Sequence, residues 1–339
     1  MVLNENPRIV LAGSVYSTRR TLQALLRHRM NLVGVLGLSA HKAAQVSGYT
    51  RLDDLLENTG IPYADFENIN EDRVAEQLKI WQPDLFFVVG LSQLVKPDLM
   101  ALPRIGCVGF HPTRLPEGRG RAPIAWLILE QRPGAATFFL MNEAADAGPI
   151  LVQEPFEVTR DDDAGSVIDK MERALEKALD TWLPQLRAGH WNPQPQDASR
   201  ATFYGRRAPA DGYIDWTRSA DEIVRLIRAS SRPHPGAYTY VNDAKLIIWK
   251  AEPEPHLPVK GVVGRVLDIT PRGVLVQTGQ GLIWLTEWAF ADPGQAPAIQ
   301  VGTSLLLKTA DEIVRLKKRL QQLETTLENL LSHIPHRSK

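Results

Sequence analysis

The sequence has a single cysteine, no net charge and no long apolar run. One cysteine, Cys107, excludes an internal disulfide and a thiolate metal cage within one chain, and its apolar neighbours favour a packed residue over a nucleophile. The 39 Lys and Arg balance the 39 Asp and Glu, so no net field attracts nucleic acid or an acidic membrane. No apolar run approaches the roughly 20 residues that span a bilayer, and residues 1–7 lack the pattern of a secretion signal. We therefore expect a cytoplasmic protein without membrane association.

Strands and helices alternate in residues 1–189. The apolar patterns predict strands over 8–12, 31–36, 84–90, 105–110, 135–141, 150–152 and 156–158, and helices over about 17–27, 52–58, 71–81, 124–130 and 161–188. Strand, helix and strand at these lengths imply parallel crossovers, so we expect an α/β domain with a Rossmann-like, doubly wound parallel sheet. Residues 37–50 show little periodicity and are expected to form a loop. The opening Ala12-Gly13-Ser14 does not complete a glycine-rich dinucleotide fingerprint, so a nicotinamide cofactor is unsupported.

The second half of the chain has a different pattern. Residues 190–205 are polar and contain two prolines, which predicts a linker. Residues 206–308 contain one helix near 220–229 and then short strands over 237–241, 245–251, 261–269, 273–278, 282–288 and 304–307. This spacing predicts a small OB-like β-barrel domain.

A C-terminal helix is expected over 309–339. Thr309 and Glu312 form a capping box, and apolar residues follow at alternating steps of three and four: Ile313, Leu316, Leu320, Leu323, Leu327, Leu330 and Ile334. About three heptads are the lower limit for predicting a coiled coil. We expect a homo-oligomer assembled through this amphipathic helix. The alternative is that the helix docks on its own barrel.

Three consecutive aspartates, Asp161, Asp162 and Asp163, stand at the start of the longest helix of the first domain. Acidic residues at a helix start complement the positive end of its dipole. Mg²⁺ also binds carboxylate clusters, but the cap is the simpler reading, and we expect no metal site.

The stretch from Gly106 to Trp126 has the composition of a functional loop. A buried strand delivers His111 into a segment rich in proline and glycine, and ligand crevices form where parallel strands end. Arg114, Arg119 and Arg121 in this loop could hold anionic groups through their planar guanidinium forks. The alternative is a rigid surface turn with solvated arginines.

These residues resemble the signature of the folate-dependent N-formyltransferases. The similarity runs through His111-Pro112, Leu115-Pro116, Arg119-Gly120-Arg121-Ala122-Pro123, Ala145-Asp146-Ala147-Gly148, residues 201–207, Tyr213-Ile214-Asp215-Trp216 and Pro235-Gly236-Ala237-Tyr238. It covers residues 8–307 and leaves the tail unmatched. Within the family, the chain is most similar to the formyltransferase domain of the enzyme that modifies UDP-4-amino-4-deoxy-L-arabinose. Methionyl-tRNA formyltransferase shares the two-domain plan but lacks the Gly-Arg-Arg found at 205–207.

The resemblance implies that His111 and Asp146 are catalytic. Formyl transfer from 10-formyltetrahydrofolate to an amine needs a proton acceptor and stabilisation of an oxyanion, and a histidine beside a carboxylate can supply both. Because both residues follow strands of one sheet, we expect the two strand ends to bring them together at the same edge.

The resemblance also implies the binding residues. Residues expected to line the folate pocket are Gln93, Leu94, Val95, Arg121, Asn142, Glu143, Ala144, Ala145 and Asp146. Arg119, Arg206 and Arg207 are expected to contact the substrate, although solvated arginines would look the same in a sequence. Leu94 and Val95 could equally begin a helix toward Met100.

One position departs from the family pattern. The family has an asparagine two residues before the histidine, where its amide is thought to bind the developing oxyanion, and this sequence has Gly109. Loss of such a donor typically costs on the order of a hundredfold in rate. His111 in its protonated form, a backbone N–H or the substrate would have to take its place.

Three functions follow as hypotheses. The first is formyl transfer from 10-formyltetrahydrofolate to a small primary amine, an amino sugar on a nucleotide being favoured. The second is a folate- or nucleotide-binding homologue with impaired transfer. The third, a methionyl-tRNA formyltransferase, is disfavoured because tRNA binding needs many Lys and Arg and this chain has no dense basic insertion.

Overall fold

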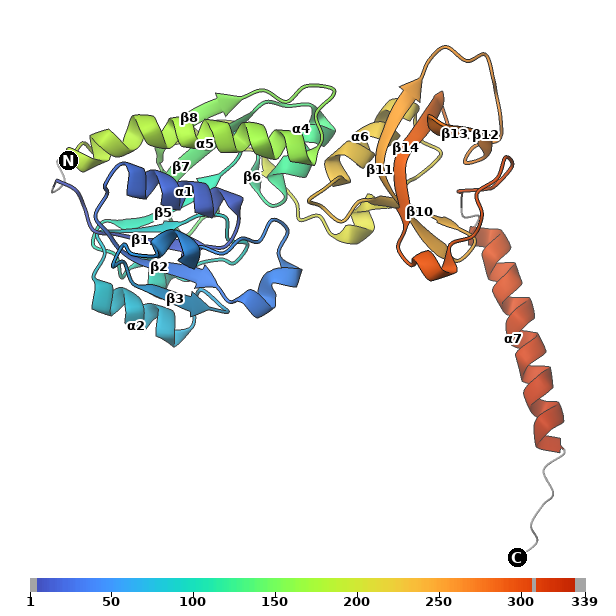
Figure 1. Cartoon of the computed structure of the whole chain (residues 1–339), viewed down its shortest axis with the longest axis horizontal. Helices are drawn as coiled ribbons and strands as arrows, with labels where there is room; N and C mark the ends of the chain where they lie inside the picture. The colour runs from blue at the N-terminus through green and yellow to red at the C-terminus, as the bar shows by residue number, and fades with distance from the viewer. Residues whose placement is uncertain (1–4, 307–308, 333–339) are drawn as a thin grey trace, which may run out of the picture. The chain divides into compact units, whose positions relative to one another are not determined.

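The computed structural model describes residues 5–306 and 309–332, which fold into two compact units (Figure 1). The first unit contains Met1–Gly212 and Arg225–Gly236, and the second contains Tyr213–Val224 and Ala237–Lys339. The chain therefore passes between the units three times.

A seven-stranded sheet forms the centre of the first unit. Its strands are β1 (Ile9–Gly13), β2 (Leu32–Leu38), β3 (Tyr63–Phe66), β4 (Leu85–Val88), β5 (Gly106–His111), β7 (Gly134–Leu140) and β8 (Ile150–Phe156), in the order β3-β2-β1-β4-β5-β7-β8. The pairs from β3 to β5 are parallel, whereas β7 is antiparallel to both β5 and β8. The predicted Rossmann-like α/β fold is confirmed, and two antiparallel strands extend its parallel part.

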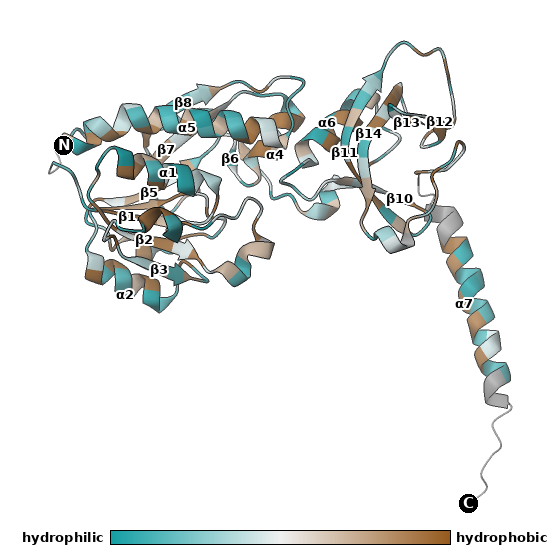
Figure 2. Cartoon of the chain, in the orientation of Figure 1, coloured by the Kyte–Doolittle hydropathy of each residue, from teal (hydrophilic) through white to brown (hydrophobic). Residues whose placement is uncertain are grey.

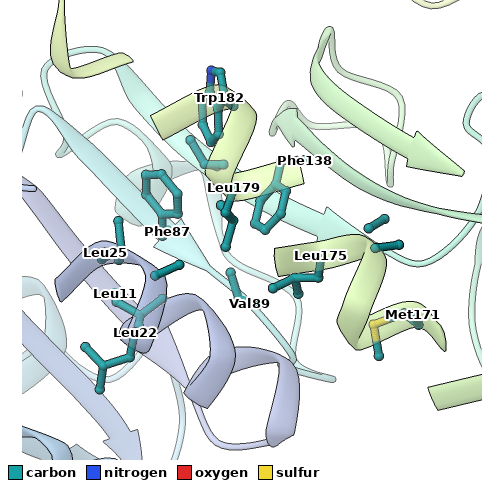
Figure 3. Packing of buried hydrophobic residues seen from close by; sticks show 14 of the residues in the cluster. Leu11, Leu22, Leu25, Phe87, Val89, Phe138, Met171, Leu175, Leu179 and Trp182 are labelled. Atoms are coloured by element: carbon teal, nitrogen blue, oxygen red, sulfur yellow. The ribbon is translucent and has the colours of Figure 1, made fainter. Parts of the chain in front are cut away.

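Helices cover both faces of this sheet. On one face lie α1 (Tyr16–Arg27), α4 (Pro123–Glu130) and α5 (Ala164–Arg187); on the other lie α2 (Asp72–Trp81) and the short α3 (Pro97–Met100). Figure 3 shows side chains of this cluster, with Leu25 of α1 and Leu179 of α5 beside Phe87 of the sheet. Burial of such side chains contributes roughly 1.5 to 3 kcal/mol each. In Figure 2 the buried strands are mostly apolar and polar residues face outward on the helices.

Some predicted local elements differ from the structure. The expected helix over 52–58 is a short 3-10 helix, η2 (Asp53–Leu56), and the expected loop over 37–50 contains another, η1 (Ala40–Gln45). The two strands expected over 150–158 are the single strand β8, and β3 was not predicted. The strands and helices on either side of these segments lie within a few residues of their predicted ranges.

The predicted linker over 190–205 is packed against the first unit. It contains η3 (Ala198–Arg200) and β9 (Phe203–Tyr204), and β9 pairs in parallel with β6 (Arg119–Gly120) in the loop after His111. A further 3-10 helix, η4 (Pro209–Gly212), follows. The segment predicted to be a linker is thus paired with the loop that follows His111.

The second unit is built on a five-stranded antiparallel sheet. Helix α6 (Ala220–Ser230), which the two units share, precedes β10 (Ala237–Val241), β11 (Ala244–Glu254), β12 (Val266–Thr270), β13 (Gly273–Gln277) and β14 (Leu282–Phe290), paired in the order β10-β11-β14-β13-β12. Of the strand predicted over 304–307, Ser304 forms one bridge with Arg265, and Leu307 lies outside the described residues. Closure into an OB-like barrel stays a prediction.

The tail forms helix α7 (Thr309–Ser332). Its apolar stripe is exposed: Ile313, Leu316, Leu320, Leu323 and Leu327 keep 47 to 60% of their surface open. The side chains of Thr309, Glu312 and Leu330, and all of Ile334, lie outside the described residues, so the capping box stays a prediction. None of the helices in the described ranges combines the length and apolar character needed to cross a bilayer.

Candidate active site

His111 is the last residue of β5 and is 6% exposed. Its Nε2 lies 2.8 Å from the carbonyl oxygen of Gly118. A carbonyl oxygen only accepts, so Nε2 must carry a hydrogen and donate it. In the neutral imidazole the lone pair is therefore on Nδ1, which makes Nδ1 the nitrogen able to take a proton.

Asp146 lies next to that nitrogen. Its Oδ2 is 3.6 Å from His111 Nδ1 and accepts a 2.8 Å hydrogen bond from the backbone N–H of Gly120. The structure thus brings the predicted pair together, but the expected route is wrong. Because β7 runs antiparallel to β5, its carboxyl end lies at the opposite edge of the sheet from His111. Asp146 reaches the histidine because residues 141–149 fold back.

A glycine and a left-handed residue shape this return loop. Asp146 has φ +53°, a conformation that costs a non-glycine residue roughly 1 to 2 kcal/mol. A Cβ on Gly148 would stand 1.7 Å from the carbonyl oxygen of Leu140, so only glycine fits there. Strained backbone of this kind is found at functional sites, where surrounding contacts hold it.

Gln196 supplies two of those contacts. Its Nε2 donates to the carbonyl oxygens of Asp146 at 2.9 Å and Gly148 at 2.7 Å. Sequence reasoning missed this residue because it lies in the polar, proline-containing segment read as a linker. The neighbouring motif at 201–207 was the only signal that the segment belongs to the site.

Residues 202–204 hold the loop that carries Gly118 and Gly120. The N–H of Gly118 donates to Thr202 Oγ1 at 2.8 Å, and the N–H of Arg121 donates to the Tyr204 carbonyl at 3.0 Å. Gly120 has φ +110°, and a Cβ there would meet the Tyr204 carbonyl oxygen at 2.3 Å. The Gly118 carbonyl contacts His111 and the Gly120 N–H contacts Asp146, so the segment that follows α5 holds in place both groups that bind these two side chains.

The predicted substrate arginines have different surroundings. Arg119 is 6% exposed, donates through Nε and Nη2 to Gln196 Oε1, and lies over the Phe203 ring. Arg207 lies over the Trp126 ring and donates to the Asp211 carbonyl, and desolvation lowers the pKa of its guanidinium. Arg206, like Arg121, is exposed.

The predicted folate segment after β4 lies at the same edge of the sheet as His111, because β4 and β5 are parallel. The Gln93 side chain accepts a hydrogen bond from the Ile69 N–H and donates one to the Glu67 carbonyl. Leu94 is 75% exposed, whereas Val95 is buried. Asn142, Glu143, Ala144 and Ala145, in the loop that carries Asp146, are all exposed.

Gly109 has no room for a side chain. A Cβ built there would stand 2.7 Å from Phe139 Cζ and 3.0 Å from Met141 Cγ. Phe139 is 3% exposed, so its ring cannot move aside into solvent. The space above Gly109 is thus filled from β7, and no donor side chain can stand at this position without repacking.

The three aspartates before α5 have structural partners. Asp163 is the N-cap, accepting from the Ser166 N–H, and Asp162 accepts from Thr159, Ser166 and Lys170. The predicted cap is confirmed. Within residues 5–306 and 309–332, no three His, Cys, Asp or Glu side chains are grouped so as to hold a metal ion.

Known proteins share this architecture. Residues 8–183 match the family model described as formyl transferase, and residues 207–297 match the model of the formyl transferase C-terminal domain. Among solved structures, HypX from Aquifex aeolicus in complex with tetrahydrofolic acid is 20% identical with a TM-score of 0.61; the match covers 85% of this chain and 45% of that one, so this chain spans about half the length of HypX.

Two smaller proteins match over nearly their whole length. An N-formyltransferase from Helicobacter canadensis, in complex with folinic acid and dTDP-3-aminofucose, is 14% identical with a TM-score of 0.60 and coverage of 82% of this chain and 98% of that one. Methionyl-tRNA formyltransferase from Clostridium thermocellum is 18% identical with a TM-score of 0.52 and coverage of 74% and 95%. At these identities the structures establish the shared fold. With more than half of its length matched by the family model, the chain belongs to the formyl transferase family of enzymes.

Proposed function

We propose that this chain transfers a formyl group from 10-formyltetrahydrofolate to the primary amine of a nucleotide-linked amino sugar. The observation that carries the proposal is the contact between His111 Nδ1 and Asp146 Oδ2 at the edge of the sheet. With Nε2 donating to the Gly118 carbonyl, Nδ1 is the nitrogen that removes the proton of the attacking amine. Asp146 then stabilises the imidazolium.

The reaction forms one bond and breaks one. The amine nitrogen bonds to the formyl carbon, and the bond between that carbon and N10 of the folate breaks. The proton taken from the amine by His111 returns to the folate nitrogen as it leaves. The oxyanion of the tetrahedral species requires a donor other than residue 109, because Gly109 is packed under Phe139. Once His111 has taken the proton of the amine, its Nδ1–H can donate to this oxyanion.

The acceptor class rests on the relatives that share this fold. It is supported by the fold shared with the Helicobacter canadensis protein, and by the resemblance to the UDP-4-amino-4-deoxy-L-arabinose enzyme. Exposed Arg206 is a candidate for a phosphate, while Arg119 and Arg207 have partners within the protein. A methionyl-tRNA acceptor is the second candidate, supported by the similarity to the Clostridium thermocellum enzyme. Equal numbers of acidic and basic residues weigh against it.

The test is an assay of purified protein with 10-formyltetrahydrofolate and a panel of UDP- and dTDP-linked amino sugars, with methionyl-tRNA in parallel. We expect a product heavier by one formyl group with at least one amino sugar. If product formed only with methionyl-tRNA, the acceptor would be methionyl-tRNA and not an amino sugar. Folate binding without any product would support the binding homologue and overturn the enzyme. His111→Asn is the matched control for background transfer.

Self-association through α7 and a cytoplasmic location belong to the same proposal. The apolar stripe of α7 is exposed and repeats at steps of three and four, the pattern by which helices pair. Fractionation of cells followed by immunodetection tests the cytoplasmic location.

A further inference from the structure

We propose that Gln196, oriented by Arg119, is a positioning residue that holds Asp146 against His111. This inference rests on the proposed function, because it gives the amide a role in the chemistry of that site. Gln196 lies in the segment after α5, where no motif predicted a catalytic role, and Arg119 was predicted to contact the substrate.

The Gln196 amide has a defined orientation. Its nitrogen donates to the carbonyls of Asp146 and Gly148, and its oxygen accepts from Nε and Nη2 of Arg119 at 3.2 and 2.7 Å. Carbonyls only accept and a guanidinium only donates, so the reversed amide would face four mismatched groups. Arg119 thereby fixes which end of the amide meets the loop.

The loop needs such a restraint for two reasons. Asp146 is in the left-handed region, a conformation that its own backbone disfavours. In addition, the loop must return along the sheet after β7 ends at the far edge, and the hydrogen bond from Gly120 N–H holds only its carboxylate. Gln196 holds the main chain on both sides of Ala147, so it fixes the position of the Asp146 backbone from which the carboxylate extends.

Arg119 can orient the Gln196 amide because its side chain is buried. It is 6% exposed, and its guanidinium contacts the Gln196 oxygen and the Phe203 ring. The Gln196 oxygen accepts from the guanidinium, which leaves the amide nitrogen free to donate to the loop. A carboxylate at position 196 would bind the guanidinium more strongly but would have no hydrogen for the two carbonyls.

That difference gives the first experiment. We expect Gln196→Glu and Gln196→Ala each to lower kcat by about tenfold to a hundredfold, since a displacement of about 1 Å has effects of that size, with KM for the folate nearly unchanged. If Gln196 served only as a partner for Arg119, the glutamate would be harmless. Gln194→Glu and Gln194→Ala are the matched controls: that residue is exposed and its amide nitrogen donates to the carbonyl of nearby Asn192.

A second experiment separates positioning from general stability. In an Asp146→Asn background, adding Gln196→Ala should change kcat by less than about threefold, because the group it positions is already lost. Full additivity of the two substitutions would overturn the proposal. Arg119→Lys, which keeps the charge but loses the fork, should give a smaller loss than Gln196→Ala and serves as the second variant if the latter folds poorly.

Hydrogen exchange tests the geometry without any activity. The backbone amides of residues 142–149 should exchange faster in Gln196→Ala and Gln196→Glu than in the wild type, and those of β1 and α5 should not change. Unchanged exchange at 142–149 would overturn the inference whatever the kinetics show. If the wild type formylated no acceptor, the proposed function would fail on its own, and faster exchange confined to this loop would still support the holding role of Gln196.

Discussion

In the proposed reaction, His111 takes the proton of the attacking amine and Asp146 stabilises the imidazolium that forms. Replacing Asp146 with asparagine removes the charge but keeps a residue that tolerates the left-handed backbone. We expect Asp146→Asn to lower kcat by about a hundredfold to ten-thousandfold, because the imidazolium loses its partner, with little change in folate affinity. Steady-state formylation and a folate titration measure the two effects. Asp161→Asn, at a side chain 91% exposed, should leave both unchanged; activity of Asp146→Asn near that of the wild type would contradict the assignment.

Gly109 is constrained by packing and not by backbone conformation. We expect Gly109→Ala to lower the free energy of unfolding by about 1 to 3 kcal/mol, since its Cβ would overlap Phe139 and Met141. Urea denaturation measures the change. Gly205→Ala is the control, because a Cβ at Gly205 meets no atom within 4 Å. A stable, more active Gly109→Asn would show that the site can accept the family's amide after all.

The residues of the site were predictable to different degrees. His111 and Asp146 stand in motifs with a recognisable order along the chain. Gln196 lies in a proline-containing segment without a motif of its own. Its amide is hydrogen-bonded to Arg119, Asp146 and Gly148, which are distant in the sequence and come together only in the fold. Cys107 was expected to be packed, and it is buried, which raises the pKa of its thiol to about 12 and keeps it protonated at neutral pH.

At the level of elements, the start of α5 is a polar network built on Asp162. Burial alone would raise the pKa of this carboxyl, but hydrogen bonds from Lys170, Thr159 and Ser166 outweigh it and lower the pKa to about 2. The unfolded value is about 3.9, so the network stabilises the protein above that pH and the stabilisation is lost as the pH falls toward 2.

Asp162→Asn should therefore lower the free energy of unfolding by about 2 kcal/mol near pH 7 and by progressively less between pH 4 and 2. Denaturant unfolding at several pH values measures the difference from the wild type. Asp161→Asn, on the exposed neighbour, should show no such trend. A difference that stayed constant with pH would mean that the side chain acts through shape and not through charge.

Element types were easier to predict than pairings. The apolar run of β4 identifies a strand buried on both faces, but nothing in the sequence of β7 states that it runs antiparallel to β5. The prediction of two strands left out residues 153–155, which belong to β8; Pro155 is tolerated there because β8 is an edge strand. The other edge strand, β3, has four residues and a mixed pattern, so it was missed.

For the whole molecule, α7 presents an apolar stripe that the described residues leave open to solvent. We expect Leu320→Asp combined with Leu323→Asp to shift the protein to a smaller species in light scattering after size-exclusion chromatography, because charges on the stripe oppose helix pairing. The control pair, Gln321→Asp with Gln322→Asp, adds the same charge on the other side of the helix. A monomeric wild type at micromolar concentration would remove the assembly prediction.

The packing of residues 190–205 has a consequence for making chimaeras of this family. A crossover at residue 189 would separate Asp146 from Gln196 and the Gly118 loop from Thr202, so a hybrid joined there would inherit half of its site from each parent. Even a junction after Gly212 would leave Arg225–Gly236 to be supplied by the other parent. Swapping acceptor preference between relatives therefore calls for grafting the first unit as two separate pieces.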